Sequence, residues 1–257
     1  MSDINKTNTV NSENILLFID SEKYKLCLDI NKKGLFFTIK IAILESNAKA
    51  FVYRKTKSLS LKNSKKTILE TAINTSSLAF SMNNGNNLRL SVLTNTIFEE
   101  LNTSLDFILE NPIKPKESNT QITAFKNIKG NISTDEKCIS IDGAGFILKD
   151  TNKNNARTNS AYFCVNNSFY FLSLSNNEAI LTSLKSDGTI KNSTLSMVKD
   201  VQNFNLSSSF ELKNAEISLK FTKIEGLETD TNKKLPSFFN LLLKEGKEDL
   251  NTICYIK

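Results

Sequence analysis

The chain has 257 residues, of which 39% are hydrophobic and 23% charged, so it is long enough for one large β domain or two small ones. It contains no histidine, which excludes Ser-His-Asp and Cys-His catalysis and histidine-ligated zinc. The net charge is +6, but the lysines are spread along the chain. The densest basic patches, residues 54–57 and 62–66, lack the aromatic or glycine-rich context of a nucleic-acid module, so we expect no nucleic-acid partner.

Residues 1–13 are polar and without periodicity, which predicts a mobile tail. They lack the apolar core of a signal peptide, and the longest apolar run, residues 34–44, is too short to span a bilayer as a helix. We therefore expect a cytoplasmic protein without membrane insertion. No two cysteines have the spacing of a zinc or redox motif, so we expect no metal and four reduced, buried thiols: Cys27, Cys138, Cys164 and Cys254.

Short runs of β-branched and aromatic residues follow, separated by Asn, Asp, Ser and Lys clusters, which is typical of many short strands. The clearest hairpin covers residues 77–93, where Leu78, Phe80 and Met82 alternate with small residues before an Asn-rich turn. A second half-exposed hairpin covers residues 209–224. Further strands are predicted at 15–20, 24–30, 35–44, 49–54, 121–126, 137–142, 144–149, 160–165, 168–174, 178–184, 188–198 and 251–256.

Helical signals are few. Residues 96–109 suit either a short helix or a strand, and residues 237–244 are the best short helix because Pro236 precedes them. Neither segment resembles a crossover helix between parallel strands. The sequence therefore predicts an all-β fold, an antiparallel barrel, double barrel or sandwich with one short C-terminal helix.

Two of the three prolines lie in the polar segment 111–119. Proline cannot donate to a sheet ladder, so this segment is predicted to be a connection rather than a central strand. We place it between an N-terminal β half at 14–110 and a C-terminal β half at 120–257.

Two sequence features could carry chemistry. The loop Asp142-Gly143-Ala144-Gly145 is rich in glycine, but a phosphate cradle needs a following helix and the sequence here continues as a strand. A turn or bulge is therefore favoured. The carboxylates Asp135, Glu136, Asp142 and Asp150 would suit acid–base work if they converged in a cleft, and solvated strand ends otherwise.

Aromatic residues concentrate in the strands at 160–165 and 168–174, where Tyr162, Phe169 and Phe171 are candidate ligand-binding residues. Strand alternation places Phe169 and Phe171 on one face, pointing into the protein, and Tyr170 on the other. These aromatics suit either a core between two sheets or the lining of an apolar cavity inside a barrel.

Several short motifs occur in order after residue 120: residues 128–132, residues 141–146, Tyr162-Phe163, residues 168–174, Asp187-Gly188 and residues 217–221. In this order the sequence resembles the lipocalin-like two-barrel proteins that include carotenoid 1,2-hydratases and related uncharacterised bacterial families. The resemblance covers at most the C-terminal half of the chain. It implies a barrel fold and an apolar ligand, and it assigns no catalytic residue.

These features favour a non-catalytic β-barrel module that binds an apolar or amphipathic small molecule and needs no cofactor. A structural or protein-interaction β-sandwich without a ligand is the alternative. An enzyme that works through carboxylates is the third interpretation.

Overall fold

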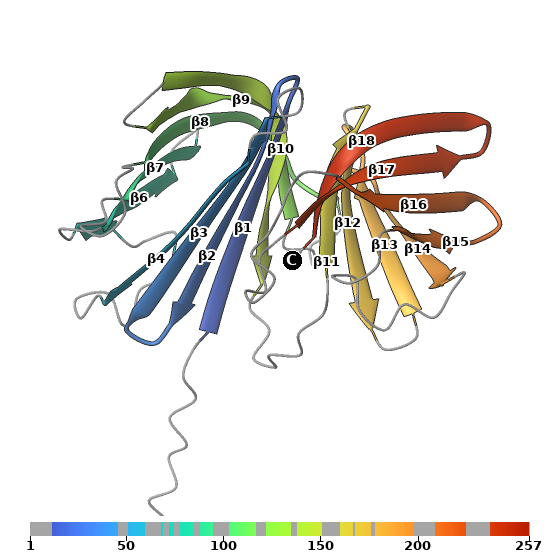
Figure 1. Cartoon of the computed structure of the whole chain (residues 1–257), viewed down its shortest axis with the longest axis horizontal. Helices are drawn as coiled ribbons and strands as arrows, with labels where there is room; N and C mark the ends of the chain where they lie inside the picture. Colours follow the sequence, from blue (N-terminus) through green and yellow to red (C-terminus); the bar gives the residue numbers. More distant parts are fainter. Residues whose placement is uncertain are drawn as a thin grey trace, which may run out of the picture.

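The computed structural model of the chain describes residues 12–45, 51–59, 68, 72–74, 78–84, 88–94, 103–116, 122–134, 138–150, 160–166, 168–175, 178–197, 209–224 and 237–256. In these residues the chain forms eighteen β-strands, arranged as two antiparallel sheets that pack against each other (Figure 1). The predicted all-β antiparallel fold is confirmed. No α-helix occurs in this part of the chain, and therefore none that could cross a membrane.

The first sheet has ten strands in the order β4-β3-β2-β1-β10-β9-β8-β7-β6-β5 and curves round on itself (Figure 1). Strands that follow each other in the chain pair as antiparallel neighbours, except β4 and β5, which lie at the two edges of the sheet. The first strand, β1, pairs with the last, β10. Its strands are β1 (Ser12–Ser21), β2 (Tyr24–Lys33), β3 (Phe36–Glu45), β4 (Phe51–Leu59), β5 (Ala72–Asn74), β6 (Leu78–Asn84), β7 (Leu88–Thr94), β8 (Thr103–Ile113), β9 (Ile122–Thr134) and β10 (Cys138–Asp150).

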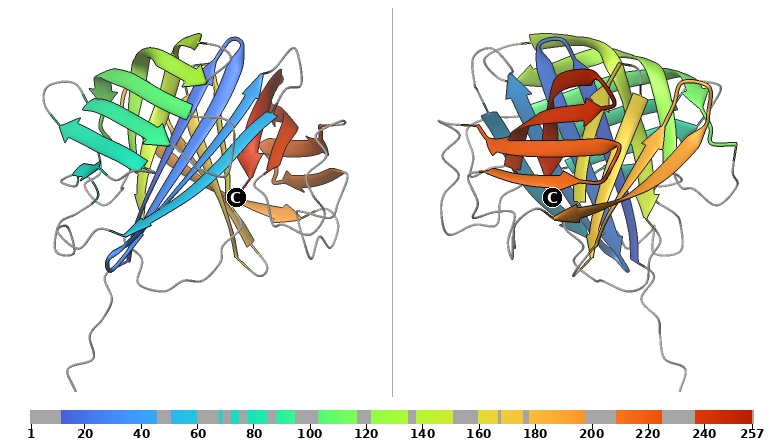
Figure 2. Two further views of the ribbon diagram at one scale, coloured as in Figure 1. Left: turned by 60° about the vertical axis from the view of Figure 1, so that its left-hand side comes forward. Right: turned by 90° about the vertical axis from the view of Figure 1, so that its right-hand side faces the viewer.

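The second sheet is a closed eight-stranded barrel in sequential order (Figure 2). Closure occurs where the first strand pairs with the last, at Ala161↔Ile256 and Tyr162↔Tyr255. The barrel strands are β11 (Ser160–Val165), β12 (Ser168–Ser175), β13 (Glu178–Leu184), β14 (Ile190–Met197), β15 (Ser209–Lys213), β16 (Ile217–Lys223), β17 (Ser237–Glu245) and β18 (Glu248–Ile256).

Three hydrophobic clusters stabilise this arrangement. One fills the inside of the curved sheet, a second fills the barrel, and a third lies between the sheet and the barrel. Residues 15–19 are apolar without interruption because both faces of β1 are covered: Ile15, Leu17 and Ile19 belong to the first cluster, whereas Leu16 and Phe18 belong to the third. The chain therefore has one core for each sheet and one core shared by both.

The C-terminal helix predicted at residues 237–244 is wrong. This segment is β17, which pairs with β16 on one side and β18 on the other. Phe239, Leu241 and Leu243 alternate into the barrel core, while Phe238 faces the cluster between the two sheets. The strand alternation of this segment buries large side chains in two cores. This burial stabilises a strand more than the preceding proline favours the start of a helix.

The division between the two sheets falls between β10 and β11. The segment 111–119, predicted as a connection between two halves, lies within the first sheet. Its first three residues end β8, and the next two strands, β9 and β10, also belong to that sheet. Asn111 adopts a φ of 54°, a left-handed conformation that Asn tolerates, just before Pro112 pairs with Phe125. The following residues contact the barrel, where the Lys116 backbone N–H donates to the Gly188 oxygen at 3.1 Å.

Both predicted hairpins are confirmed as β6–β7 and β15–β16. In the second, the Asn214 side-chain oxygen accepts the N–H groups of Glu216 and Ile217 at 2.9 and 2.8 Å, which fixes the turn. The strand alternative for residues 96–109 is supported from Thr103 onward, where β8 begins. Of the tail predicted at 1–13, residues 12 and 13 belong to β1, and residues 1–11 lie outside the described part, as does the basic patch at 62–66.

Candidate functional site

A cavity of about 550 Å³ lies where the curved sheet meets the barrel. Its walls come from segments far apart in the sequence: the end of β1 and start of β2, then β9, β10 and the β11–β12 hairpin. The lining residues are Asp20, Ser21, Glu22, Lys25, Lys126, Asp142, Gly143, Ala144, Cys164, Val165, Asn166 and Phe169. Seven of them are charged or polar in their side chains, so this is not the apolar barrel cavity that the sequence suggested.

Strand alternation brings the polar residues of the cavity to the buried side of the first sheet. Leu16, Phe18 and Asp20 follow one another at a period of two, so Asp20 shares the face that packs against the barrel. On the neighbouring strand Lys25 pairs with Asp20, and its face is that of Cys27. A carboxylate and an ammonium group are thus placed side by side at the edge of an apolar interface.

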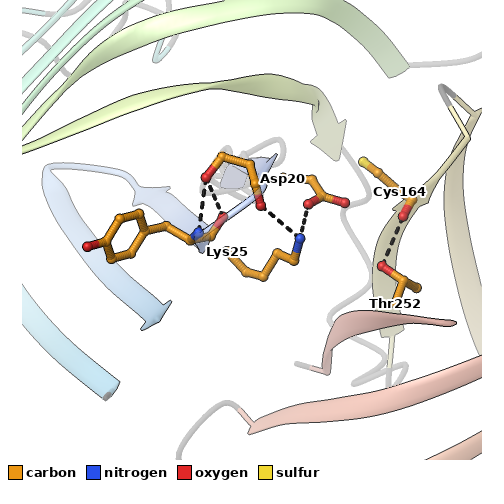
Figure 3. A network of polar contacts seen from close by, with 6 residues as sticks. Asp20, Lys25, Cys164 and Thr252 are labelled. Atoms are coloured by element: carbon orange, nitrogen blue, oxygen red, sulfur yellow. Dashed lines mark hydrogen bonds and ion pairs between the residues drawn. The ribbon is translucent and has the colours of Figure 1, made fainter. Parts of the chain in front are cut away.

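Asp20 and Lys25 form an ion pair and a hydrogen bond (Figure 3). Their side chains are only 17% and 12% exposed, respectively. The Lys25 ammonium also donates to the Ser21 backbone oxygen at 2.9 Å. The Ser21 hydroxyl closes the turn, because it donates to the Tyr24 oxygen at 2.9 Å and accepts the Tyr24 N–H at 3.1 Å. The pair is therefore held by a short, well-bonded hairpin.

Burial raises the pKa of Asp20 above its ordinary value, and the neighbouring Lys25, through its charge and its hydrogen bond, lowers it by less. A carboxyl group with a raised pKa is protonated more easily than an ordinary aspartate. A perturbed carboxyl beside a cation in a cavity is typical of an acid–base site.

Cys164 lies on the barrel side of the cavity, across from Asp20 (Figure 3). Burial raises the pKa of its thiol well above the ordinary value, and the nearby Asp20 carboxylate raises it further. The Thr252 hydroxyl donates to the Cys164 backbone oxygen at 3.1 Å, which ties β11 to β18. The thiol is therefore a wall of the cavity rather than a nucleophile.

The predicted bulge at Asp142-Gly143-Ala144-Gly145 is confirmed, since the pairing of β10 with β9 shifts between Gly143 and Gly145. It places Asp142 at the cavity, so one of the four carboxylates proposed for acid–base work does reach it. Asp135 and Glu136 lie outside the described residues, as does the side chain of Asp150. Asp142 itself is exposed, as are Glu22 and Lys126.

The three candidate ligand-binding residues all lie on the outer face of the barrel, in the cluster shared with the curved sheet. Phe169 lines the cavity, whereas Tyr162 and Phe171 stack on each other behind it, with ring centroids 5.4 Å apart. Tyr170 points into the barrel and stacks on Phe163 at 4.8 Å, so the predicted split between the two faces is correct.

Sequence reasoning missed Asp20 and Lys25. The signal that could have found them is a charge at the same alternating position as buried apolar residues, Leu16 and Phe18 in β1 and Cys27 in β2. No group of His, Cys, Asp or Glu side chains suited to a metal ion occurs in the described residues. Cys27, Cys164 and Cys254 are buried free thiols as predicted, but Cys138 is exposed because it begins β10 near the solvent.

No family model matches the sequence, and no curated protein matches it. Among solved structures, the chain is similar to kievitone hydratase from Nectria haematococca, with a TM-score of 0.62 and 10% sequence identity over 96% of this chain and 88% of that one. It is also similar to CghA with Sch210972, with a TM-score of 0.49 and 8% identity over the same shares of the two chains, a likeness too low to support an argument.

The likeness to kievitone hydratase is one of fold and agrees with the resemblance to lipocalin-like two-barrel proteins. It contradicts the expectation of a non-catalytic binding module, because the protein that shares the fold is named as an enzyme. The observed architecture is that of a two-sheet protein with a charged cavity between the curved sheet and the barrel.

Proposed function

We propose that this protein is an acid–base enzyme that adds water to a carbon–carbon double bond of a small molecule, or removes it, in the cavity between the sheet and the barrel. The observation that carries the proposal is the half-buried Asp20–Lys25 pair that lines this cavity. The hydratase named among the structures of the same fold supports the choice of reaction class.

Asp20 is the proton-transfer group in this mechanism. In the hydration direction its carboxylate takes a proton from water while the water oxygen bonds to one carbon of the double bond. The electron pair of the π bond passes to the other carbon, which then takes the proton from the Asp20 carboxylic acid. The net change is the addition of H and OH, and the carboxylate is restored.

Lys25 and Phe169 have supporting roles in the proposal. The Lys25 ammonium holds the carboxylate of Asp20 in place and offsets the negative charge that develops during the reaction. Phe169 supplies an apolar wall for the carbon skeleton of the substrate, with Phe146 packed edge-on against it at 6.2 Å. The small-molecule partner of this chain is thus a substrate in this proposal.

The test is incorporation of labelled oxygen. Wild-type protein is incubated in H₂¹⁸O with a panel of unsaturated and hydroxylated small molecules, and products are detected by mass spectrometry. We expect labelled alcohols from the wild type and a loss of about 10²- to 10⁴-fold in Asp20→Asn, the usual share of a general acid–base group.

The matched control is Asp249→Asn. Asp249 also pairs with a lysine, Lys244 at 3.0 Å, but that pair is half exposed at the β17–β18 hairpin and does not line the cavity. Turnover by this variant should equal that of the wild type. Equal turnover by Asp20→Asn and the wild type would refute the proposal.

A further inference from the structure

We propose that Gly143 is a positioning residue of the site, because its missing side chain lets the end of β1 approach β10 and so determines where the Asp20 carboxyl lies. This inference rests on the function proposed above and names a residue that acts through Asp20 rather than on the substrate.

The contact between the two strands leaves no room for a side chain. In the pairing of β1 with β10, Gly143 lies opposite Ser21 and Ala144 lies opposite Asp20. A Cβ atom on Gly143 would lie 2.3 Å from the Asp20 backbone oxygen and 3.0 Å from both the Asp20 carbonyl carbon and the Ser21 Cβ. Nonbonded carbon atoms pack at about 3.5–4.0 Å, so the Asp20 backbone would have to move away from β10.

The same close approach continues one step into the sheet. A Cβ atom on Gly145 would lie 2.2 Å from the Phe18 backbone oxygen. Gly143 and Gly145 therefore both lack a side chain where β10 approaches the backbone of β1 at Asp20 and Phe18. Phe18 is fixed by the core between the sheets, where its ring lies 5.8 Å from that of Phe146, so the free end that can yield is Asp20 with its hairpin.

Movement of Asp20 away from β10 would change its surroundings. The charged and titratable groups that line the cavity with it are Lys25 from β2, Glu22 from the hairpin turn, Lys126 from β9, Asp142 from β10 and Cys164 from β11. Burial is the larger influence on the Asp20 carboxyl and Lys25 the smaller. A displacement changes both the cover over the carboxyl and its distance from Lys25, so the pKa of Asp20 should shift from its wild-type value.

The experiment compares Gly143→Ala with Gly130→Ala. A Cβ atom on Gly130 would lie 2.0 Å from the Asp106 backbone oxygen, so this control introduces an equally severe clash in the same sheet, between β9 and β8. Gly130 does not line the cavity. The carboxyl pKa of Asp20 is measured by NMR titration of ¹³C-labelled aspartate, and folding is followed by circular dichroism.

We expect both variants to lose stability and only Gly143→Ala to shift the pKa of Asp20 and to reduce turnover in the labelled-water assay. An unchanged Asp20 pKa in folded Gly143→Ala, or an equal change in Gly130→Ala, would overturn the positioning role. Full turnover by Asp20→Asn overturns the proposed function instead, so the two failures are distinguishable.

A second variant serves if Gly143→Ala does not fold. Asp20→Glu moves the carboxyl by one methylene group without touching β10. If turnover falls, the reaction depends on where this carboxyl lies, which the positioning role of Gly143 requires. If turnover is that of the wild type, the site tolerates displacement and a positioning residue has no role.

Discussion

Phe146→Ala should separate the curved sheet from the barrel more than any other single truncation in the shared core. Phe146 is 1% exposed, and its ring lies 5.8 Å from Phe18 in its own sheet and 6.2 Å from both Tyr162 and Phe169 in the barrel. Its ring therefore contacts aromatic side chains of both sheets.

The expected loss follows from these contacts. Burial of a Phe side chain contributes about 1.5–3 kcal/mol, and the cavity left by truncation brings the total for Phe→Ala to about 3–5 kcal/mol. Aromatic pairs add about 0.5–1.5 kcal/mol each beyond the buried area, and Phe146 makes three such contacts. We expect a loss in the upper half of that range, about 4–5 kcal/mol of the free energy of unfolding.

Urea denaturation followed by circular dichroism measures this loss, since the chain has no tryptophan to report by fluorescence. Phe36→Ala is the matched control. Phe36 belongs to the same sheet but is 64% exposed, so its truncation should change stability by no more than about 0.5 kcal/mol. A loss below about 1 kcal/mol for Phe146→Ala would refute the view that the two sheets share a packed core.

Three further predictions concern single groups. A thiol reagent should label Cys138 rapidly in native protein and Cys254 only after denaturation, because burial raises the pKa of the Cys254 thiol far above its usual range; rapid labelling that persists in Cys138→Ser would contradict this. The pKa of Asp20 is raised above 3.8 on folding, so wild type should lose stability relative to Asp20→Asn as pH rises from about 3.8 through the raised pKa; chemical denaturation at several pH values would show a constant difference if the carboxyl were unperturbed. Asn214→Ala removes a side-chain oxygen that accepts two backbone N–H groups, so it should cost about 1–3 kcal/mol, and a thermal melt identical to that of the wild type would count against the turn geometry.

Local patterns in the sequence were enough to predict most strands. Period-two alternation identified the β6–β7 and β15–β16 hairpins, and β10 was read as two strands because Gly143 interrupts its pattern. Alternation is a property of residues close together in the sequence, so it can be recognised without knowing which strand pairs with which. It also separated Tyr170 from Phe169 correctly.

The candidate site could not be predicted in the same way, because it depends on contacts between distant segments. Asp20, Asp142 and Cys164 meet only after β1 has paired with β10 and the barrel has packed against both. Each residue taken alone looks like a solvated strand end or a buried thiol. The boundary between the sheets was misplaced for a related reason: the prolines near residue 112 mark a local irregularity of β8, whereas the true division depends on which strands pair.

The closure of the barrel by β11 and β18 has a consequence for the order in which this chain folds. The paired residues Ala161 and Ile256 are about 95 residues apart in the chain. In the same way, β1 can pair with β10 only after the eight strands between them have been synthesised. Such long-range pairings are entropically costly and slow to form. During synthesis all strands of the curved sheet are available once residue 150 has left the ribosome. The barrel cannot close until residue 256 has emerged, because β11 pairs with β18. The half-built barrel would then present unpaired strand edges, so an edge-binding chaperone would meet this half of the nascent chain for longest.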